Sequence, residues 1–354
     1  MFNSSSKFQD FKVKRKEKKW QLFRATDFQS LMHPCFTFSR ILGIFPYKIN
    51  ASTIKICKPY YVLSTIIICV FCVGELINFY RININKKAIY KSVPRALQIN
   101  CFHIFGSSIA ITTYILSGQR MRLLQTILEL SLRLPPKSFK NLSKWIHIKD
   151  TLGLVLLMAH GLINYPRMQL SVFHVIMTAY IILLVFHMDM LYMNCVCVLK
   201  ACFKQINDNL ENIRELVVHD KPYLVKETFH EQRNPFLLME LKALKKRYLA
   251  ISDTVQILNM VFWLQLLCTI IMTFIQITIH LFFYLIQMHK SVSTDSQKRV
   301  YYDYFIVCAT YHIIKIVLIV WACETGKDQA MEINTTVYNV LNSTNDEQMK
   351  YEVG

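Results

Sequence analysis

Six long runs of apolar residues divide the chain into segments of membrane-spanning length. A membrane helix needs about 20 mostly apolar residues, since each residue rises about 1.5 Å and the hydrocarbon core is about 30 Å thick. The third run is the weakest, because it is short unless its helix begins near Trp145. The fold class we expect is all-α, a polytopic membrane helix bundle. The six predicted spans are Tyr60–Tyr80, Ala96–Ser117, Thr151–Tyr165, Leu170–Asn194, Ile257–Gln287 and Asp303–Cys323.

Composition and charge support this class and set its orientation. The 354 residues are 53% hydrophobic and 18% charged, below the roughly 25% charged share of soluble proteins. The net charge of +18 does not indicate a nucleic-acid partner, because the basic residues lie mostly between the apolar runs and no nucleic-acid-binding motif accompanies them. With the N-terminus in the cytoplasm, the inner segments hold 31 Lys and Arg and the outer segments 9, which predicts that orientation. The outer segment 81–95 departs from this rule, with five basic residues and no acidic one.

The runs also organise the chain into five segments. A basic cytoplasmic segment, 1–59, precedes membrane helices one to four in 60–194. A cytoplasmic helical segment, 195–256, leads to helices five and six in 257–323, and an amphipathic tail, 324–354, follows. This order predicts a multi-pass protein embedded in a lipid bilayer.

The cytoplasmic segment before the fifth span carries a heptad pattern of apolar residues that runs without a break to Leu258. This pattern predicts a helix much longer than the bilayer requires, so helices four and five should project together into the cytoplasm. We favour a role in assembly between subunits, and the alternative is a helical hairpin that packs only on itself. The predicted assembly residues are Leu237, Leu241, Leu244, Tyr248, Ile251 and Val255.

Catalytic and metal-binding motifs give no support for an enzyme. The chain has no HExxH, P-loop or GxSxG sequence, and the Cys195–Cys197 pair is a weak zinc signal without further ligands. We therefore expect neither a metal nor a cofactor. Two charged residues fall within spans: Lys315 should pair or snorkel, and Asp189 is either functional or a helix-end residue in contact with solvent.

Polar and aromatic side chains gather in the predicted outer halves of spans two to six. Aromatic rings with a few hydrogen-bonding groups are typical of a small-molecule pocket. The alternative is that these residues anchor the helices at the membrane interface. The candidate ligand-binding residues are Asn100, His103, Tyr165, His174, Tyr180, Gln276, His280, Tyr284, Tyr304 and Tyr311.

The stretch "DFQSLMHPCFTFSRILGIFPYKI" (Asp27–Ile49) resembles the start of insect gustatory receptors, as does the order of spans that follows it. The tail from "ACE" to "VYNVL" also looks like the segment before that family's seventh helix. The resemblance implies a taste receptor: a ligand-gated cation channel of the plasma membrane in sensory neurons, built as a homo- or hetero-tetramer. Cytoplasmic helices would hold the subunits together, and a small-molecule tastant, by a slight preference bitter, would bind in an outward-opening pocket. An odorant-receptor-like subunit is the related alternative.

The tail departs from that family in one respect. Members carry Thr-Tyr, five mostly hydrophobic residues and Gln-Phe in their seventh helix, and no such pattern follows Cys323. We therefore expect the tail to be the cytoplasmic part of a seventh helix in a truncated form of the receptor. A transporter is a further alternative, but it would show an internal repeat of Gly- or Pro-broken helices, and we see none.

Overall fold

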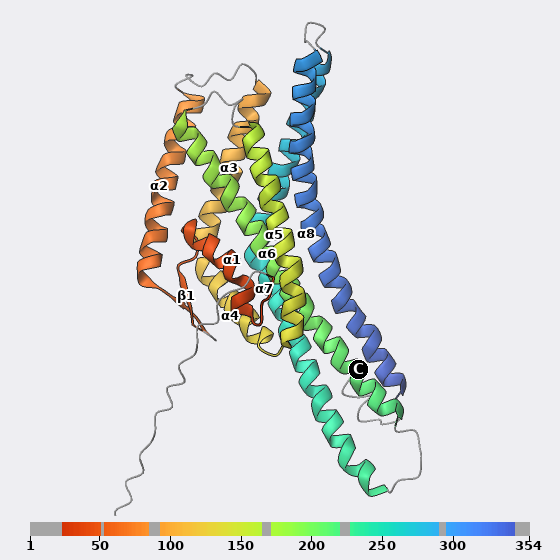
Figure 1. Ribbon diagram of the computed structural model, residues 1–354. Coiled ribbons are helices and arrows are strands. Elements are labelled where there is room, and N and C mark those ends of the chain that lie inside the picture. The colour runs from red at the N-terminus through yellow and green to blue at the C-terminus, as the bar shows by residue number, and fades with distance from the viewer. Residues whose placement is uncertain are drawn as a thin grey trace, which may run out of the picture.

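The computed structural model is an elongated helix bundle with one short β-hairpin, and it describes residues 23–50, 53–84, 93–164, 171–219, 227–289 and 295–343 (Figure 1). Strands β1 (Tyr47–Asn50) and β2 (Thr53–Ile56) pair antiparallel. The helices are α1 (Phe28–Ile41), α2 (Lys58–Asn83), α3 (Val93–Ile115), α4 (Ser117–Ser131), α5 (Pro136–Asn164), α6 (Val172–His219), α7 (Glu227–His289) and α8 (Asp295–Ser343).

The predicted membrane spans correspond to helices α2, α3, α5, α6, α7 and α8. Within the described residues, five helices are long and apolar enough to cross a membrane, and six if α3 and α4, bent by 65°, form one span. The weak third run lies in α5, which begins at Pro136, well before Trp145, and so has ample length. The prediction of a polytopic, nearly all-helical membrane protein is confirmed.

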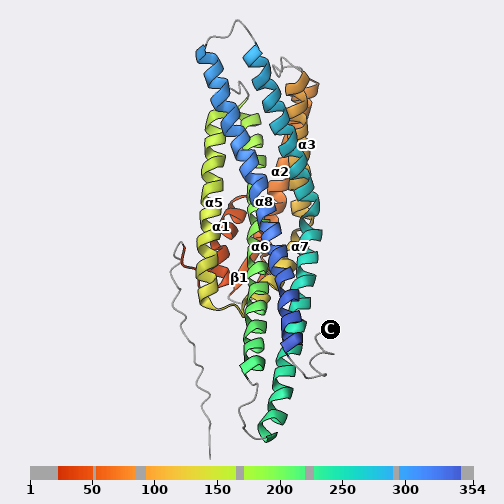
Figure 2. The same ribbon diagram turned by 90° about the vertical axis from the view of Figure 1, so that its right-hand side faces the viewer.

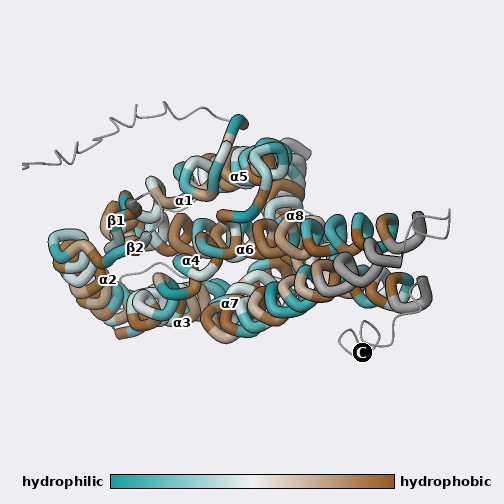
Figure 3. Tube along the Cα trace, turned by 90° about the horizontal axis from the view of Figure 1, so that it is seen from below, coloured by the Kyte–Doolittle hydropathy of each residue, from teal (hydrophilic) through white to brown (hydrophobic). Residues whose placement is uncertain are grey.

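Helix α6 is the centre of the bundle, and helices α1 to α5, α7 and α8 all contact it or each other around it (Figure 3). Its most apolar stretch is 83% buried within the chain, against 28–33% for the other four spans. Those four therefore keep apolar surface for lipid, while α6 is covered by protein. Gly106 lets α3 approach α6 closely, since a Cβ there would lie 2.3 Å from the Ile181 side chain.

Helices α6, α7 and α8 continue beyond the other helices as a three-helix extension, which we call the distal bundle (residues 200–219, 236–256 and 324–343; Figures 1 and 2). The heptad residues of α7 face its interior. Leu237, Leu241, Leu244 and Ile251 are buried, and the Tyr248 ring lies 5.9 Å from the Phe203 ring of α6.

These residues therefore pack within their own chain, and their predicted role in assembly between subunits stays a prediction. The tail differs from expectation, because residues 324–343 continue the helix of the sixth span without a break instead of forming a separate helix. Its amphipathic pattern is nevertheless used, since Ile333 and Val340 are buried in the core.

The segment before the first span folds against the bundle through α1 and the hairpin. Asp27 and Ser30 form a reciprocal capping box at the start of α1, and Gly43, with φ of 71°, turns the chain after its end. The hairpin was not anticipated. A two-stranded hairpin is marginal alone, and here the backbone N–H of Ile54 donates to Gln125 of α4 at 2.7 Å.

Candidate functional site

A cavity of about 530 Å³ lies among α3, α5, α6, α7 and α8, in the half of the bundle that we predict to be outermost. Its apolar lining includes Ile99, Phe102, Leu157 and Met272. A volume of several hundred Å³, apolar walls and a few convergent polar groups are typical of a small-molecule site. Its polar and aromatic lining residues are Arg95, Gln98, His103, His160, His174, Thr178, Gln276, His280, Tyr304, Tyr311, His312 and Lys315.

The structure brings together six of the ten residues that the sequence suggested for ligand binding. They come from four helices: His103 from α3, His174 from α6, Gln276 and His280 from α7, and Tyr304 and Tyr311 from α8. Their contact with a ligand stays a prediction, but they share one cavity.

Three of the other suggested residues lie elsewhere, and Tyr165 falls outside the described residues. Asn100 exchanges hydrogen bonds with Asn83 of α2, at 2.9 and 3.0 Å. The Tyr180 hydroxyl donates to the Leu42 carbonyl at 3.2 Å, where it holds the end of α1. The Tyr284 ring stacks on Phe305 with centroids 4.8 Å apart, so it joins α7 to α8.

Sequence reasoning did not select Arg95, Gln98, His160, His312 and Lys315 as lining residues. A usable signal existed on α3, because Arg95, Gln98 and Phe102 recur at spacings of three and four on one helical face. On α8, Lys315 follows Tyr311 by four residues, so these two side chains also share one helical face. A search for polar residues at helical spacing, extended to charged ones, would have found both.

One wall of the cavity is a hydrogen-bonded network from three helices. Glu75 of α2 pairs with His103 Nδ1 at 2.9 Å. Asn78, one turn further along α2, lies between two histidines, 3.4 Å from His103 and with its Oδ1 2.8 Å from His174 Nδ1. These residues are nearly inaccessible to solvent, so the network fixes α2, α3 and α6 relative to one another.

The opposite wall is a group of aromatic and imidazole rings. His160 of α5 stacks on Tyr311 with centroids 5.1 Å apart and meets the His312 ring edge-on at 5.5 Å. The Tyr304 hydroxyl and His280 Nδ1 are 3.2 Å apart. His312 is only 7% exposed, and its Nδ1 has no hydrogen-bond partner among the described residues. A buried polar atom without a partner is unfavourable, and a ligand can supply that partner.

A buried ion pair closes the inner end of the cavity. Lys315 Nζ of α8 lies 3.0 Å from Asp189 Oδ2 of α6, and both side chains are almost fully buried. Thr269 and Gln265 of α7 donate to Asp189 Oδ1 at 3.2 and 3.4 Å. The predicted pairing of Lys315 is therefore observed, whereas Asp189 has no solvent contact. Three helices meet at this one carboxylate.

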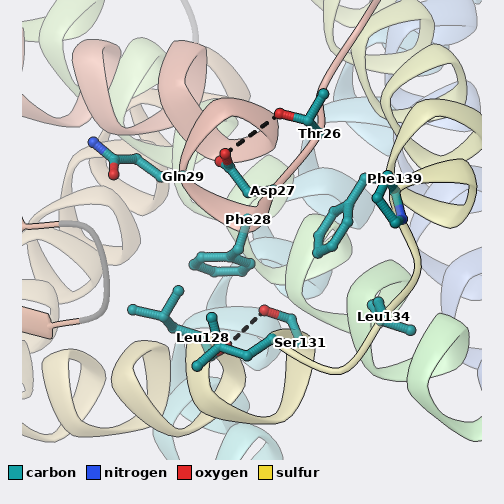
Figure 4. A pocket seen from close by; sticks show the side chains of 10 residues that line it. Thr26, Asp27, Phe28, Gln29, Leu128, Ser131, Leu134 and Phe139 are labelled. Carbon is teal, nitrogen blue, oxygen red and sulfur yellow. Dashed lines mark hydrogen bonds between the residues drawn. The ribbon is translucent and has the colours of Figure 1, made fainter. Parts of the chain in front are cut away.

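A second, smaller cavity of about 290 Å³ lies at the opposite end, between the start of α1, α4 and α5 (Figure 4). Phe28, Leu128 and Phe139 line it, and the hydroxyls of Thr26 and Ser131 make local bonds to Asp27 and to the Leu128 carbonyl. These two hydroxyls are thus already used, and the lining holds fewer polar groups than that of the first cavity, which is the stronger candidate. No group of His, Cys, Asp or Glu within the described part of the chain is arranged to hold a metal ion.

Comparison with known proteins was made for families and for individual relatives. No curated protein matches the sequence. The family described as 7tm Chemosensory receptor matches residues 32–353, from α1 to a point beyond the end of α8. Such a family supports a role in detecting small molecules at a membrane rather than in catalysis. Since the match covers almost the whole chain, the protein belongs to the 7tm chemosensory receptor family.

Proposed function

We propose that this chain is a gustatory-type chemoreceptor subunit of a ligand-gated, non-selective cation channel in the plasma membrane. The observation that carries the proposal is the cavity in the predicted outer half, which gathers six of the residues suggested by the sequence in a member of a chemosensory family. The ligand is a small molecule, because a volume of about 530 Å³ suits a compound of modest size.

The helices that line the cavity offer a route for the signal. Helices α6, α7 and α8 each run from the cavity to the distal bundle, and the Asp189–Lys315 pair joins them just below the cavity. A ligand shifts a conformational equilibrium only by binding one state more tightly. A ligand beside Lys315 meets the junction of these three helices, and a shift there would reach the distal bundle.

Assembly into a tetramer is the second part of the proposal. The heptad residues are buried within their own chain, so we propose that they contribute to assembly by holding the distal bundle together. Phe236 and Met239 lie on another face of α7 in the predicted cytoplasmic segment, and they are 59% and 61% exposed. Lipid does not cover apolar groups there, so a neighbouring subunit is their proposed partner. Met239→Glu should reduce the crosslinked tetramer while leaving the subunit folded.

The test of the receptor role uses two glycines. A Cβ on Gly161, which lines the cavity, or on Gly118, which does not, would meet no atom within 4 Å. Gly161→Phe should therefore add a ring at the cavity with no clash at its Cβ, and Gly118→Phe is the matched control.

The full chain is expressed in cultured cells, and a tastant panel is applied during recordings of cation current. We expect Gly161→Phe to weaken the response at least tenfold at equal surface level, with Gly118→Phe unchanged. An equal response in Gly161→Phe would refute the cavity as the ligand site. Tastant binding at the surface without current would refute the channel activity.

A further inference from the structure

The charged residues that line the cavity are all cationic. Of the described residues that line it, only Arg95 and Lys315 carry full charges, and no Asp or Glu is among them. Lys315 is compensated by Asp189, whose carboxylate lies behind the lining at 3.0 Å, and the Glu75 carboxylate, also behind the lining, pairs with His103 at 2.9 Å. The half-buried Arg95 guanidinium donates to the neutral amide of Gln98 at 2.8 Å. The net positive charge that faces the cavity therefore centres on Arg95.

The hydrogen-bonding groups beside Arg95 that face the cavity are mostly donors. The Gln98 carbonyl oxygen accepts from Arg95, and Gln98 Nε2 in turn donates to the Gln276 carbonyl oxygen at 2.6 Å. Each amide oxygen thus already accepts one hydrogen bond within the wall. The groups that a ligand meets at this end are mostly donors: the Nε2 group of Gln276 and further N–H groups of Arg95. Such a lining favours a ligand that brings acceptors.

Much of the remaining wall is apolar. Ile99, Phe102, Leu183 and Met272 are among these apolar lining residues. A cationic ligand would meet a like charge in a partly buried site, whereas a carboxylate would meet a guanidinium whose geometry suits it. The apolar wall then accommodates a hydrocarbon or aromatic body.

We infer that the cavity selects small carboxylic acids with an apolar body, bound as carboxylates with Arg95 at the polar end. This inference rests on the proposed function, because it names the ligand class of the same cavity. Lys315 is not the anchor, since Asp189 already holds it. His312, with its unpaired Nδ1, provides a second polar contact further along the cavity.

The test compares three compounds of one shape: 3-phenylpropanoate, 3-phenylpropan-1-ol and 3-phenylpropylamine. The purified full chain in lipid nanodiscs is titrated with each at neutral pH. Thermal unfolding is followed with a thiol-reactive dye, because Cys195 and Cys308 are fully buried in the folded protein. We expect the acid to raise the unfolding midpoint and to bind about tenfold more tightly than the alcohol, as a charge-assisted hydrogen bond would provide. The amine should bind most weakly.

Arg95→Gln should remove the preference for the acid and leave alcohol binding within about twofold, since it keeps a polar side chain but removes the charge and the guanidinium donors. Arg81→Gln is the matched control, because Arg81 lies over the Phe173 ring and does not line the cavity. The unfolding midpoint without ligand checks that each variant is folded.

The outcomes separate this inference from the proposed function. Equal binding of acid and alcohol, unchanged by Arg95→Gln but blocked by Gly161→Phe, would overturn the carboxylate preference and keep the cavity as a ligand site. Tightest binding of the amine, or binding of none of the three, would also overturn the preference. Acid binding that persists in Gly161→Phe would place the ligand elsewhere and overturn both.

Discussion

The cavity half and the distal bundle are built from the same three helices, yet they bury different residues. In the distal bundle, α6, α7 and α8 meet through aliphatic side chains such as Leu210 and Leu244, which are about 2% exposed. Around the cavity, the same helices bury His174, His280 and His312. Aliphatic packing fixes one arrangement of helices, whereas a polar lining around empty space can exchange partners with a ligand. The distal bundle is therefore the more rigidly packed half, and the cavity half is the one whose polar groups can change partners.

The largest effect should come from the ion pair between the two halves. Lys315→Met leaves the Asp189 carboxylate buried without its cation, so we expect the free energy of unfolding to fall by about 3–5 kcal/mol. The double variant Asp189→Leu/Lys315→Met removes both charges and should recover most of this loss. Unfolding by SDS titration in mixed micelles measures both. A double variant as unstable as the single one would show that the pair itself, and not the orphaned charge, stabilises the junction.

Truncation of the distal core should have the next largest effect. Leu244 is 2% exposed, and Leu244→Ala leaves a cavity, so we expect a loss of about 2–4 kcal/mol. Leu249 on the same helix is 53% exposed, and Leu249→Ala should stay within about 0.5 kcal/mol. If the two substitutions cost the same in monomeric protein, the heptad residues do not pack within the chain.

The two halves also differ in how far the sequence revealed them. The period of three and four residues marked Leu237 to Leu258 as one buried face, because apolar burial on a helix leaves that periodic signal. Its partner could not be read, since the same face can pack on its own chain or on another subunit. The six spans followed from length and hydropathy alone, because a bilayer imposes both.

The cavity left a weaker signal in the sequence. Side-chain chemistry and position in the outer half of a span were enough to select His103, Gln276 and Tyr311. Neither property tells which face of each helix points inward. Asn100 and Tyr284 have similar chemistry and lie at a similar depth in the predicted membrane. Asn100 nevertheless hydrogen-bonds to α2, and Tyr284 stacks on a ring of α8, outside the cavity. Rotation of a helix about its axis is set by tertiary packing, such as the close approach at Gly106, and composition does not encode it.

Within the cavity half, the bridging asparagine should have a moderate effect. Asn78 is 2% exposed and contacts His103 and His174, so Asn78→Ala leaves the buried His174 Nδ1 without its partner at 2.8 Å, while His103 keeps Glu75. We expect a loss of about 1–3 kcal/mol in the free energy of unfolding.

Asn83→Ala, which breaks the exposed pair with Asn100, is the control and should cost less than about 0.5 kcal/mol. A similar cost for both would mean that the network does not hold α2 in place.

The smallest effect should come from the solvated surface of the distal bundle. Glu211 and Arg214 form an ion pair one turn apart on α6, and both side chains are a third or more exposed. Glu211→Gln should therefore cost only about 0.3 kcal/mol, because water screens the pair and both side chains lose rotamer freedom in forming it. The cost should vanish in 0.5 M salt, roughly where the screening length falls below 5 Å. A loss above about 1 kcal/mol that persists in salt would show that Glu211 also supports the packing of α6 against α8, and the distal bundle would then depend on polar contacts as the cavity half does.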